Sequence, residues 1–496
     1  MNKLLILNSH ISIRIPKNIR SLRNPFKTQQ IKSIISMSTT QEAESTNNIT
    51  SNTSSTYRKP TSPSGVPLSQ VSTKLFPLSF NESFQDYKTR KEILKIQDEL
   101  LSTLPFYPEP SKTHSSEIKQ FKSPNSLLFP DINEFHVKPL NPTEKDKHLV
   151  IIHGYGAGLG FFIKNIEKLS SEYPDWNIHA IDLPGYGCST RVKFPFNIPN
   201  NDYKLVEKLF TIPLSDWYKF NKLNNENSIT VAHSMGGYFS LLLQMNEING
   251  ENFINEREFE ILKNKNGFFN RFSKDNIELN LKFQNQLKEL SKTNENPTTF
   301  WNSLILVSPG GIHHENSHEI EAKIPTWFSK LWNLNVSPFS LVRNTGPLGS
   351  YFVSGWTSRR FSINNLFNDE TIKLLHKYSY AIFNAKGSGE YMLNYLLSPG
   401  ALPKNPLLNR IESLKFTKFR SIWLYGSNDW MDFNGGIKSC EKLNNINLKN
   451  GKLDNSNDSI FEIVPGAGHH IYLDAFNKFN EIVGNEMNFL ESKKSN

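Results

Sequence analysis

The sequence predicts an α/β fold in which a mostly parallel sheet carries helices on both faces. Six short apolar runs rich in β-branched residues alternate with helix-like stretches, at 148–154, 177–185, 228–234, 303–311, 420–426 and 460–466. Continuous apolar runs are typical of strands buried on both faces, and the stretches between them are long enough for the crossovers that parallel pairing requires. Several runs also end in short motifs of glycine, serine, aspartate or histidine, which places polar chemistry at strand ends.

The formal charge of +9 is concentrated at the start of the chain. Residues 1–40 contain no acidic residue and seven basic ones, so the remainder is close to neutral, which excludes a nucleic-acid partner. Ile11, Ile15, Ile19 and Leu22 share one helical face among these basic residues, a pattern that predicts a mitochondrial presequence over 1–40. The alternative is a basic tail without structure.

The remaining composition predicts the domain boundaries. Residues 41–74 are poor in apolar side chains and are expected to form a disordered linker. The sheet-forming core is expected over 75–311 and 401–496, with a polar surface insertion at 246–300. Residues 312–400 are rich in aromatic side chains without strand-like alternation, which predicts a helical cap inserted between two strands.

The cysteine count and the hydropathy pattern exclude several classes of protein. Cys188 and Cys440 are too few for a disulfide framework or a thiolate metal cluster, and the sequence predicts neither a metal nor a cofactor. No stretch reaches the roughly 20 apolar residues of a membrane-spanning helix, so any membrane contact is expected to be peripheral.

The run at 228–234 ends in the motif Ala232-His233-Ser234-Met235-Gly236. A serine hydroxyl that attacks an ester must project from a sharp turn between a strand and a helix, and such a turn requires small residues two positions before and after the serine. We therefore predict that Ser234 is the nucleophile. Ala232 stands where glycine is usual, which adds one methyl group to a tight turn.

Glycines also follow the run at 148–154, in His153-Gly154-Tyr155-Gly156. They allow the backbone to approach a negatively charged oxygen closely, and we predict an oxyanion hole formed by the amides of Tyr155 and Met235. A phosphate-binding loop is disfavoured because no Gly-Lys-Ser/Thr follows.

The last two runs end in candidates for the acid and the base. Asp429 follows the strand at 420–426 and is preferred over Asp432, which stands farther from the strand end. His469 follows the glycines after the strand at 460–466 and is preferred over His470. The order serine, aspartate, histidine is that of the α/β-hydrolase fold and differs from the order in other serine hydrolases.

With these residues the chain resembles the α/β-hydrolase subfamily of phospholipid deacylases and lysophospholipid acyltransferases, and within it the fungal mitochondrial cardiolipin-specific deacylases. The resemblance covers about 75–496 and is carried by the stretches at 332–361 and 425–432 and by a His-x-x-x-x-Asp motif, here His469 to Asp474. That motif is associated with acyl transfer in the subfamily. We prefer the alternative, in which Asp474 is a structural residue that favours the start of a helix, over a direct role in the reaction.

The resemblance implies a serine hydrolase that removes an acyl chain from a mitochondrial phospholipid, cardiolipin first, at the surface of the inner membrane. The alternatives are an acyl-CoA-dependent lysophosphatidic acid acyltransferase and a lipid-bound co-activator without catalysis. In the cap, we expect aromatic side chains to contact the acyl chains and Arg343, Arg359 and Arg360 to contact the head group, because a guanidinium binds phosphate oxygens in pairs. The alternative is that the aromatic side chains pack the cap onto the core and the arginines are solvated.

Overall fold

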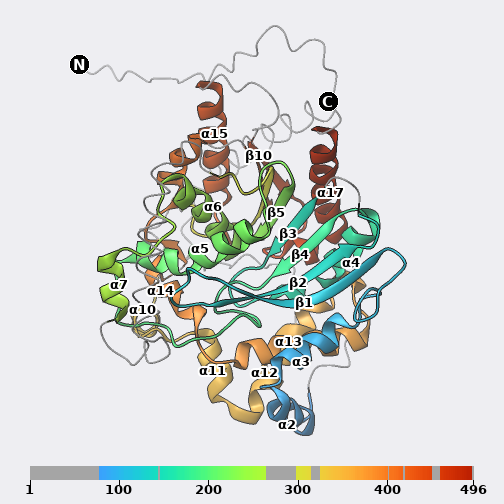
Figure 1. Ribbon diagram of the computed structural model, residues 1–496. Coiled ribbons are helices and arrows are strands. Elements are labelled where there is room, and N and C mark those ends of the chain that lie inside the picture. The colour runs from blue at the N-terminus through green and yellow to red at the C-terminus, as the bar shows by residue number, and fades with distance from the viewer. Residues whose placement is uncertain are drawn as a thin grey trace, which may run out of the picture. The chain divides into compact units, whose positions relative to one another are not determined.

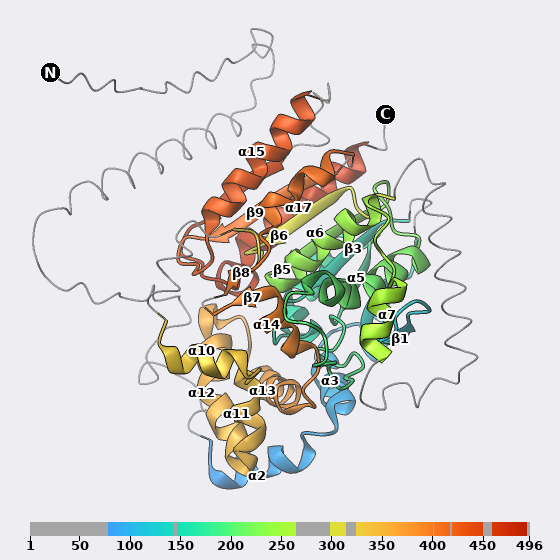
Figure 2. The same cartoon turned by 90° about the vertical axis from the view of Figure 1, so that its left-hand side faces the viewer.

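The computed structural model describes residues 78–142, 146–263, 298–313, 324–399, 401–416, 419–449 and 459–493. The expected presequence at 1–40, the linker at 41–74 and the part of the surface insertion from 264 to 297 lie outside these ranges. Figures 1 and 2 show the chain in two views related by a 90° turn.

An eight-stranded sheet forms the centre of the described chain, in the order β1-β2-β4-β3-β5-β6-β9-β10. Its strands are β1 (His114–Lys122), β2 (Asp131–Pro139), β3 (His148–Ile152), β4 (Asn177–Ile181), β5 (Ser228–His233), β6 (Ser303–Val307), β9 (Arg420–Gly426) and β10 (Ser459–Val464). The six strands from β4 to β10 in this order pair in parallel, and they correspond to the six apolar runs of the sequence. The antiparallel strands β1 and β2 were not anticipated.

Helices cover both faces of the sheet. Because side chains alternate along a strand, Val150 and Ile152 of β3 enter one apolar core while Leu149 and Ile151 enter the other. The first core lies beneath α5 (Tyr203–Phe220), α6 (Met235–Ile248), α7 (Glu256–Lys263) and α15 (Phe433–Lys449). The second lies beneath α4 (Ile163–Glu172), which follows the 3-10 turn η4 (Leu159–Phe162), and beneath α16 (Ile471–Asp474) and α17 (Phe476–Lys493).

The segment between β6 and β9 is helical, as the expected cap requires. It contains α10 (Thr326–Asn333), α11 (Pro338–Asn344), α12 (Gly349–Phe361), α13 (Asp369–Asn384), α14 (Leu393–Leu396), the 3-10 turns η6 (Gly346–Leu348) and η7 (Ile363–Asn365), and a small ladder of β7 (Leu397–Ser398) with β8 (Leu402–Pro403). Among the described helices, none has the length and apolar character needed to cross a bilayer.

The first two described helices contact the cap helices, and the later of the two also packs into the second core. The helix α2 (Phe80–Thr89) contacts α12, and α3 (Ile93–Leu101) contacts α13, so the four helices lie together in both views (Figures 1 and 2). A buried hydrogen bond from Ser350 to Asp86, at 2.6 Å, joins α12 to α2. Residues 80–101 therefore connect the cap to the core, and the predicted boundary between the two stays a prediction.

Candidate active site

The three predicted triad residues come together at one edge of the sheet. Ser234 follows β5, Asp429 follows β9 and His469 follows β10, and these strands run in parallel with β6 between the first two. The carboxyl ends of parallel strands share an edge of the sheet, so loops from distant parts of the sequence meet there.

Ser234 occupies a strained turn between β5 and α6. Its backbone has φ 52° and ψ −113°, a conformation that costs free energy in a residue with a side chain, and its N–H donates to the Val307 carbonyl at 2.8 Å. A Cβ atom on Gly236 would lie 2.6 Å from the His153 carbonyl oxygen, so the turn requires glycine there. Ala232 is fully buried in β5, and the turn forms with this alanine in place of the usual glycine.

The histidine lies between the other two members. His469 Nε2 is 3.0 Å from Ser234 Oγ, and its Nδ1 is 3.0 Å from Asp429 Oδ1. Burial raises the pKa of Asp429, but the hydrogen bond and positive charge of His469 outweigh it, so this pKa lies below its ordinary value. The carboxylate therefore stays charged and can orient the ring and stabilise its protonated form.

The competing candidates have other contacts. Asp432 Oδ1 accepts from the Asn434 amide at 3.0 Å, at the start of α15. His470 is half-buried beside His233, and desolvation, with the charge of Arg360 second, holds its pKa well below the ordinary value. The preference for Asp429 and His469 thus agrees with the geometry.

Ser308, at the end of β6, was missed by the sequence analysis. It is fully buried with φ 48°, and its hydroxyl is one of the groups that lower the pKa of Asp429. The sequence does contain a signal for this residue, because Ser308 directly follows an apolar run, as Ser234 does.

The loop predicted to form the oxyanion hole lies beneath the cap. Phe339 of α11 stacks on the Tyr155 ring, with centroids 5.6 Å apart, and its ring blocks the space that a side chain on Gly156 would need. The Met235 amide is the first N–H of α6, where intrahelical partners are lacking and negative charge is favoured. The role of the Tyr155 and Met235 amides stays a prediction.

The three cap arginines differ in their surroundings. Arg343 is already paired with Glu390 Oε1 at 2.5 Å. Arg359 is partly exposed and donates to the Gly355 carbonyl, so its contact with a head group stays a prediction. Arg360 was wrongly expected at a solvent-facing entrance, because its side chain is only 2% exposed and is paired with Asp474 at 3.2 Å.

Asp474 is engaged by two buried contacts, and its role stays a prediction. Its side chain is 1% exposed, and Oδ2 accepts the Gly468 amide at 2.9 Å while Oδ1 meets Arg360. These buried contacts favour an aspartate at this position, which also lies in the first turn of α16.

The cap aromatics fall into two groups. Trp356 packs against Phe161 of η4, which fixes the cap to the core, and against Phe383 of α13. The Trp332 indole donates to the Leu397 carbonyl at 3.3 Å, within the cap segment. Other apolar side chains of the cap, three aromatic and three aliphatic, are exposed to solvent. Their exposed fractions are 63% for Trp327, 38% for Phe328, 41% for Leu331, 72% for Leu334, 67% for Leu341 and 57% for Phe352.

One group of possible metal ligands lies within the described ranges, away from the triad. It consists of Glu134, His136 and His179. Existing hydrogen bonds engage these side chains, since His179 meets Glu134 at 2.7 Å and His148 at 2.9 Å, and the Lys119 ammonium lies 3.1 Å from His136 Nδ1. The positive charge of the Lys119 ammonium disfavours a metal ion at this position. We therefore interpret these residues as a hydrogen-bonded network rather than a metal site.

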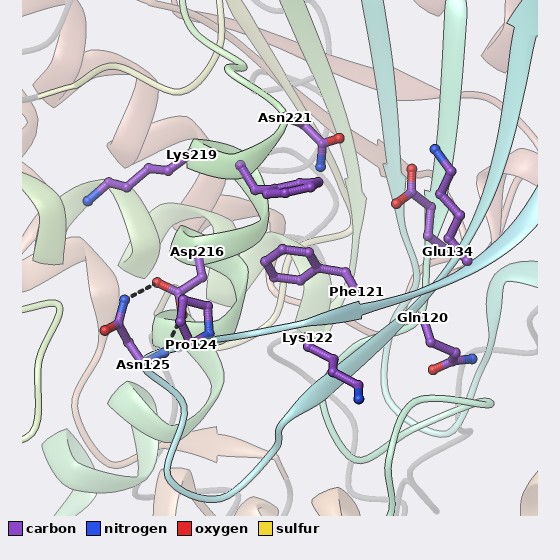
Figure 3. A pocket seen from close by; sticks show the side chains of 11 residues that line it. Gln120, Phe121, Lys122, Pro124, Asn125, Glu134, Asp216, Lys219 and Asn221 are labelled. Atoms are coloured by element: carbon purple, nitrogen blue, oxygen red, sulfur yellow. Dashed lines mark hydrogen bonds between the residues drawn. The ribbon is translucent and has the colours of Figure 1, made fainter. Parts of the chain in front are cut away.

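A cavity of about 870 Å³ opens between β1, β2 and α5, also away from the triad (Figure 3). Asp216 lies in it and accepts from Asn125, and burial raises its pKa despite these hydrogen bonds. Phe121 and Phe220 form an apolar part of the lining. The cavity contains no member of the triad.

Comparison with known proteins agrees with this geometry. A family described as "alpha/beta hydrolase fold" matches residues 147–247, which run from the start of β3 into α6 and include the turn at Ser234. The chain has the α/β-hydrolase fold. Its sequence relatives include 1-acylglycerol-3-phosphate O-acyltransferases and (lyso)-N-acylphosphatidylethanolamine lipases.

Three sequence relatives illustrate the range of proteins that the chain is similar to. The 1-acylglycerol-3-phosphate O-acyltransferase of Arabidopsis thaliana is 28% identical over 66% of this chain and 65% of its own length. The mouse (lyso)-N-acylphosphatidylethanolamine lipase is 24% identical, over 72% of this chain and 84% of the lipase. Protein ECM18 of Saccharomyces cerevisiae is 25% identical, over 72% of this chain and 75% of its own length. The match thus spans slightly less than two thirds of the plant relative.

Solved structures of the α/β-hydrolase fold are more distant. A membrane phospholipase A is 12% identical with a TM-score of 0.41, over 82% of this chain and 93% of that chain. A naproxen esterase from Bacillus subtilis is 14% identical with a TM-score of 0.41, over 80% of this chain and 96% of the esterase.

Proposed function

We propose that this protein is a serine hydrolase that removes a fatty acyl chain from a phospholipid. The observation that carries the proposal is the connected set Ser234, His469 and Asp429, with both hydrogen bonds of the histidine at 3.0 Å. Such a set activates a serine hydroxyl for attack on an ester. The likeness to a phospholipid-directed lipase and to lysophosphatidic acid acyltransferases supports an acyl ester of a phospholipid as the substrate.

In the proposed reaction, Ser234 Oγ attacks the ester carbonyl and passes its proton to His469 Nε2. The amides of Tyr155 and Met235 stabilise the negative oxygen of the tetrahedral intermediate. The histidine then donates the proton to the departing lysophospholipid oxygen, which leaves an acyl-serine. Water, deprotonated by the same nitrogen, releases the fatty acid and restores the serine.

Cardiolipin at the mitochondrial inner membrane is the proposed substrate, with peripheral membrane contact. The resemblance of the sequence and the basic, acid-free start of the chain support it. The exposed apolar side chains of the cap support contact with a bilayer, because apolar groups gathered on a surface favour such partners. A fluorescent reporter fused to residues 1–40 tests the location; a reporter that stays diffuse contradicts it.

Acyl transfer is the second candidate. It is favoured by the names of the plant and rodent relatives, and it would use acyl-CoA as donor and lysophosphatidic acid as acceptor. The contacts of Asp474 weaken the motif argument for it, since both carboxylate oxygens are engaged inside the protein.

The two reactions are separated by supplying the purified protein with cardiolipin vesicles and, separately, with acyl-CoA and lysophosphatidic acid. We expect free fatty acid and monolyso product from the first mixture, absent in the Ser234→Ala variant. Turnover of the second mixture alone contradicts the deacylase. A folded protein that no fluorophosphonate probe labels indicates the non-catalytic co-activator instead.

A further inference from the structure

A buried chain of contacts connects the cap to the loop that carries the proposed catalytic histidine. Arg360 lies on α12 in the cap, and its Nη1 meets Asp474 Oδ1 at 3.2 Å. The other oxygen of Asp474 accepts the Gly468 amide at 2.9 Å, one residue before His469. The exposed fractions of the two charged side chains are 2% and 1%.

The same loop is held at two further points. The His233 ring donates to the His469 carbonyl at 2.9 Å, from the strand below. Asn364, just after α12, donates to the Asp474 carbonyl at 2.8 Å. The backbone around His469 is therefore fixed between the sheet on one side and the cap on the other.

Because the ion pair of Arg360 with Asp474 is buried, the loss of either partner is expected to destabilise the protein. A carboxylate with 1% exposure is costly to keep charged unless it is paired and hydrogen-bonded, and removing one partner of such a pair leaves an uncompensated charge. Within the described residues, Asp474 is the acceptor that the structure provides for the Arg360 guanidinium. Arg360 thus orients the carboxylate, and the carboxylate in turn orients the Gly468 amide.

We propose that Arg360 and Asp474 are positioning residues, which transmit the placement of the cap to His469 through the Gly468 amide. The proposal rests on the proposed hydrolase function for its consequence. Displacing a reacting group by about 1 Å can cost about a hundredfold in rate, so this support affects kcat rather than substrate binding.

Two double variants separate the loop contact from the buried charges. Arg360→Met with Asp474→Asn removes both charges and keeps an oxygen that can accept the Gly468 amide. Arg360→Met with Asp474→Leu removes the charges and the acceptor together. Because neither leaves a lone buried charge, both are expected to fold, and their melting temperatures are compared first.

Fluorophosphonate labelling of Ser234 reports how well His469 activates it. We expect the leucine pair to react about tenfold to a hundredfold more slowly than the asparagine pair, with kcat reduced and KM unchanged on a soluble ester. Hydrogen exchange of the segment 465–470, followed by mass spectrometry, should be faster in the leucine pair. Equal labelling and equal exchange in the two variants overturn the proposal. If the wild-type protein is not labelled, the hydrolase function fails, and the exchange comparison still decides whether Asp474 holds the loop.

Discussion

Each of the two aspartates near the catalytic edge has a distinct contact, which makes their roles separable. Asp429 Oδ1 meets the histidine that contacts Ser234, whereas Asp432 accepts an amide at the start of α15. Both residues follow the same strand, and the sequence alone could rank them only by their distance from its end. The geometry assigns the histidine contact to the nearer one.

We therefore expect Asp429→Asn to lower kcat by about a thousandfold to ten-thousandfold, because the amide favours the wrong histidine tautomer. Asp432→Asn is the matched control, and it should affect only helix stability, by about 1 kcal/mol or less. Steady-state rates on a soluble ester and thermal melts measure both. An inactive Asp432→Asn beside an active Asp429→Asn would reverse the assignment.

Among the elements, α10 is unusual because its apolar stripe faces solvent. Trp327, Phe328, Leu331 and Leu334 recur at helical spacing and are exposed, while Trp332 attaches the helix to the Leu397 carbonyl. The described part of α10 has no buried residue. A helix with this pattern is expected to lie with its apolar face in a lipid surface.

Replacing Trp327 and Leu331 by serine should accordingly weaken binding to cardiolipin-containing vesicles by about tenfold or more, since each side chain contributes about 1.5–3 kcal/mol when fully buried. Turnover of a short soluble ester should stay unchanged. Leu448→Ser is the control, because Leu448 is 58% exposed on α15, a helix that lies apart from α10 in both views (Figures 1 and 2). Vesicle sedimentation that shows the same binding for both variants contradicts a role for this stripe.

Across the whole molecule, several buried histidines make stability depend on pH. The pKa of His136 is lowered to about 2, chiefly by burial and then by the positive charge of His179, while Glu134 opposes the shift. Since an unfolded chain protonates histidine near about pH 6.5, it binds more protons than the folded protein below that value. Stability is therefore present above about pH 6.5 and falls as the pH drops toward 2.

The variant His136→Gln should lose less stability on acidification, by about 1.4 kcal/mol per pH unit between about pH 6 and pH 4. Urea unfolding at pH 7, 6 and 5 measures the difference. Parallel curves for the variant and the wild type would show that His136 is protonated in the folded state as well.

Much of the fold and the site could be predicted from the sequence, because local patterns encode them. The six parallel strands are continuous apolar runs, and Ser234, Asp429 and His469 each follow such a run directly. Strand β1 was missed because its sequence, HSSEIKQFK, lacks such a run and its side chains are mostly half-buried. The pair of Arg360 with Asp474 joins residues 114 positions apart, so no local pattern reveals it. The packing of α2 and α3 on the cap depends on distant partners in the same way.

The chain separation of Ser234 and His469, 235 residues with the cap helices α10 to α14 between them, has a consequence for the timing of the proposed activity. A polypeptide that emerges from a ribosome or a translocation channel with its amino terminus first delivers the nucleophile, then the cap, and the acid and base last. Domains form from such a chain as their segments become available. The shortened intermediates thus carry a serine without its proton acceptor, so we expect the proposed hydrolase to become active only after nearly the full length has emerged.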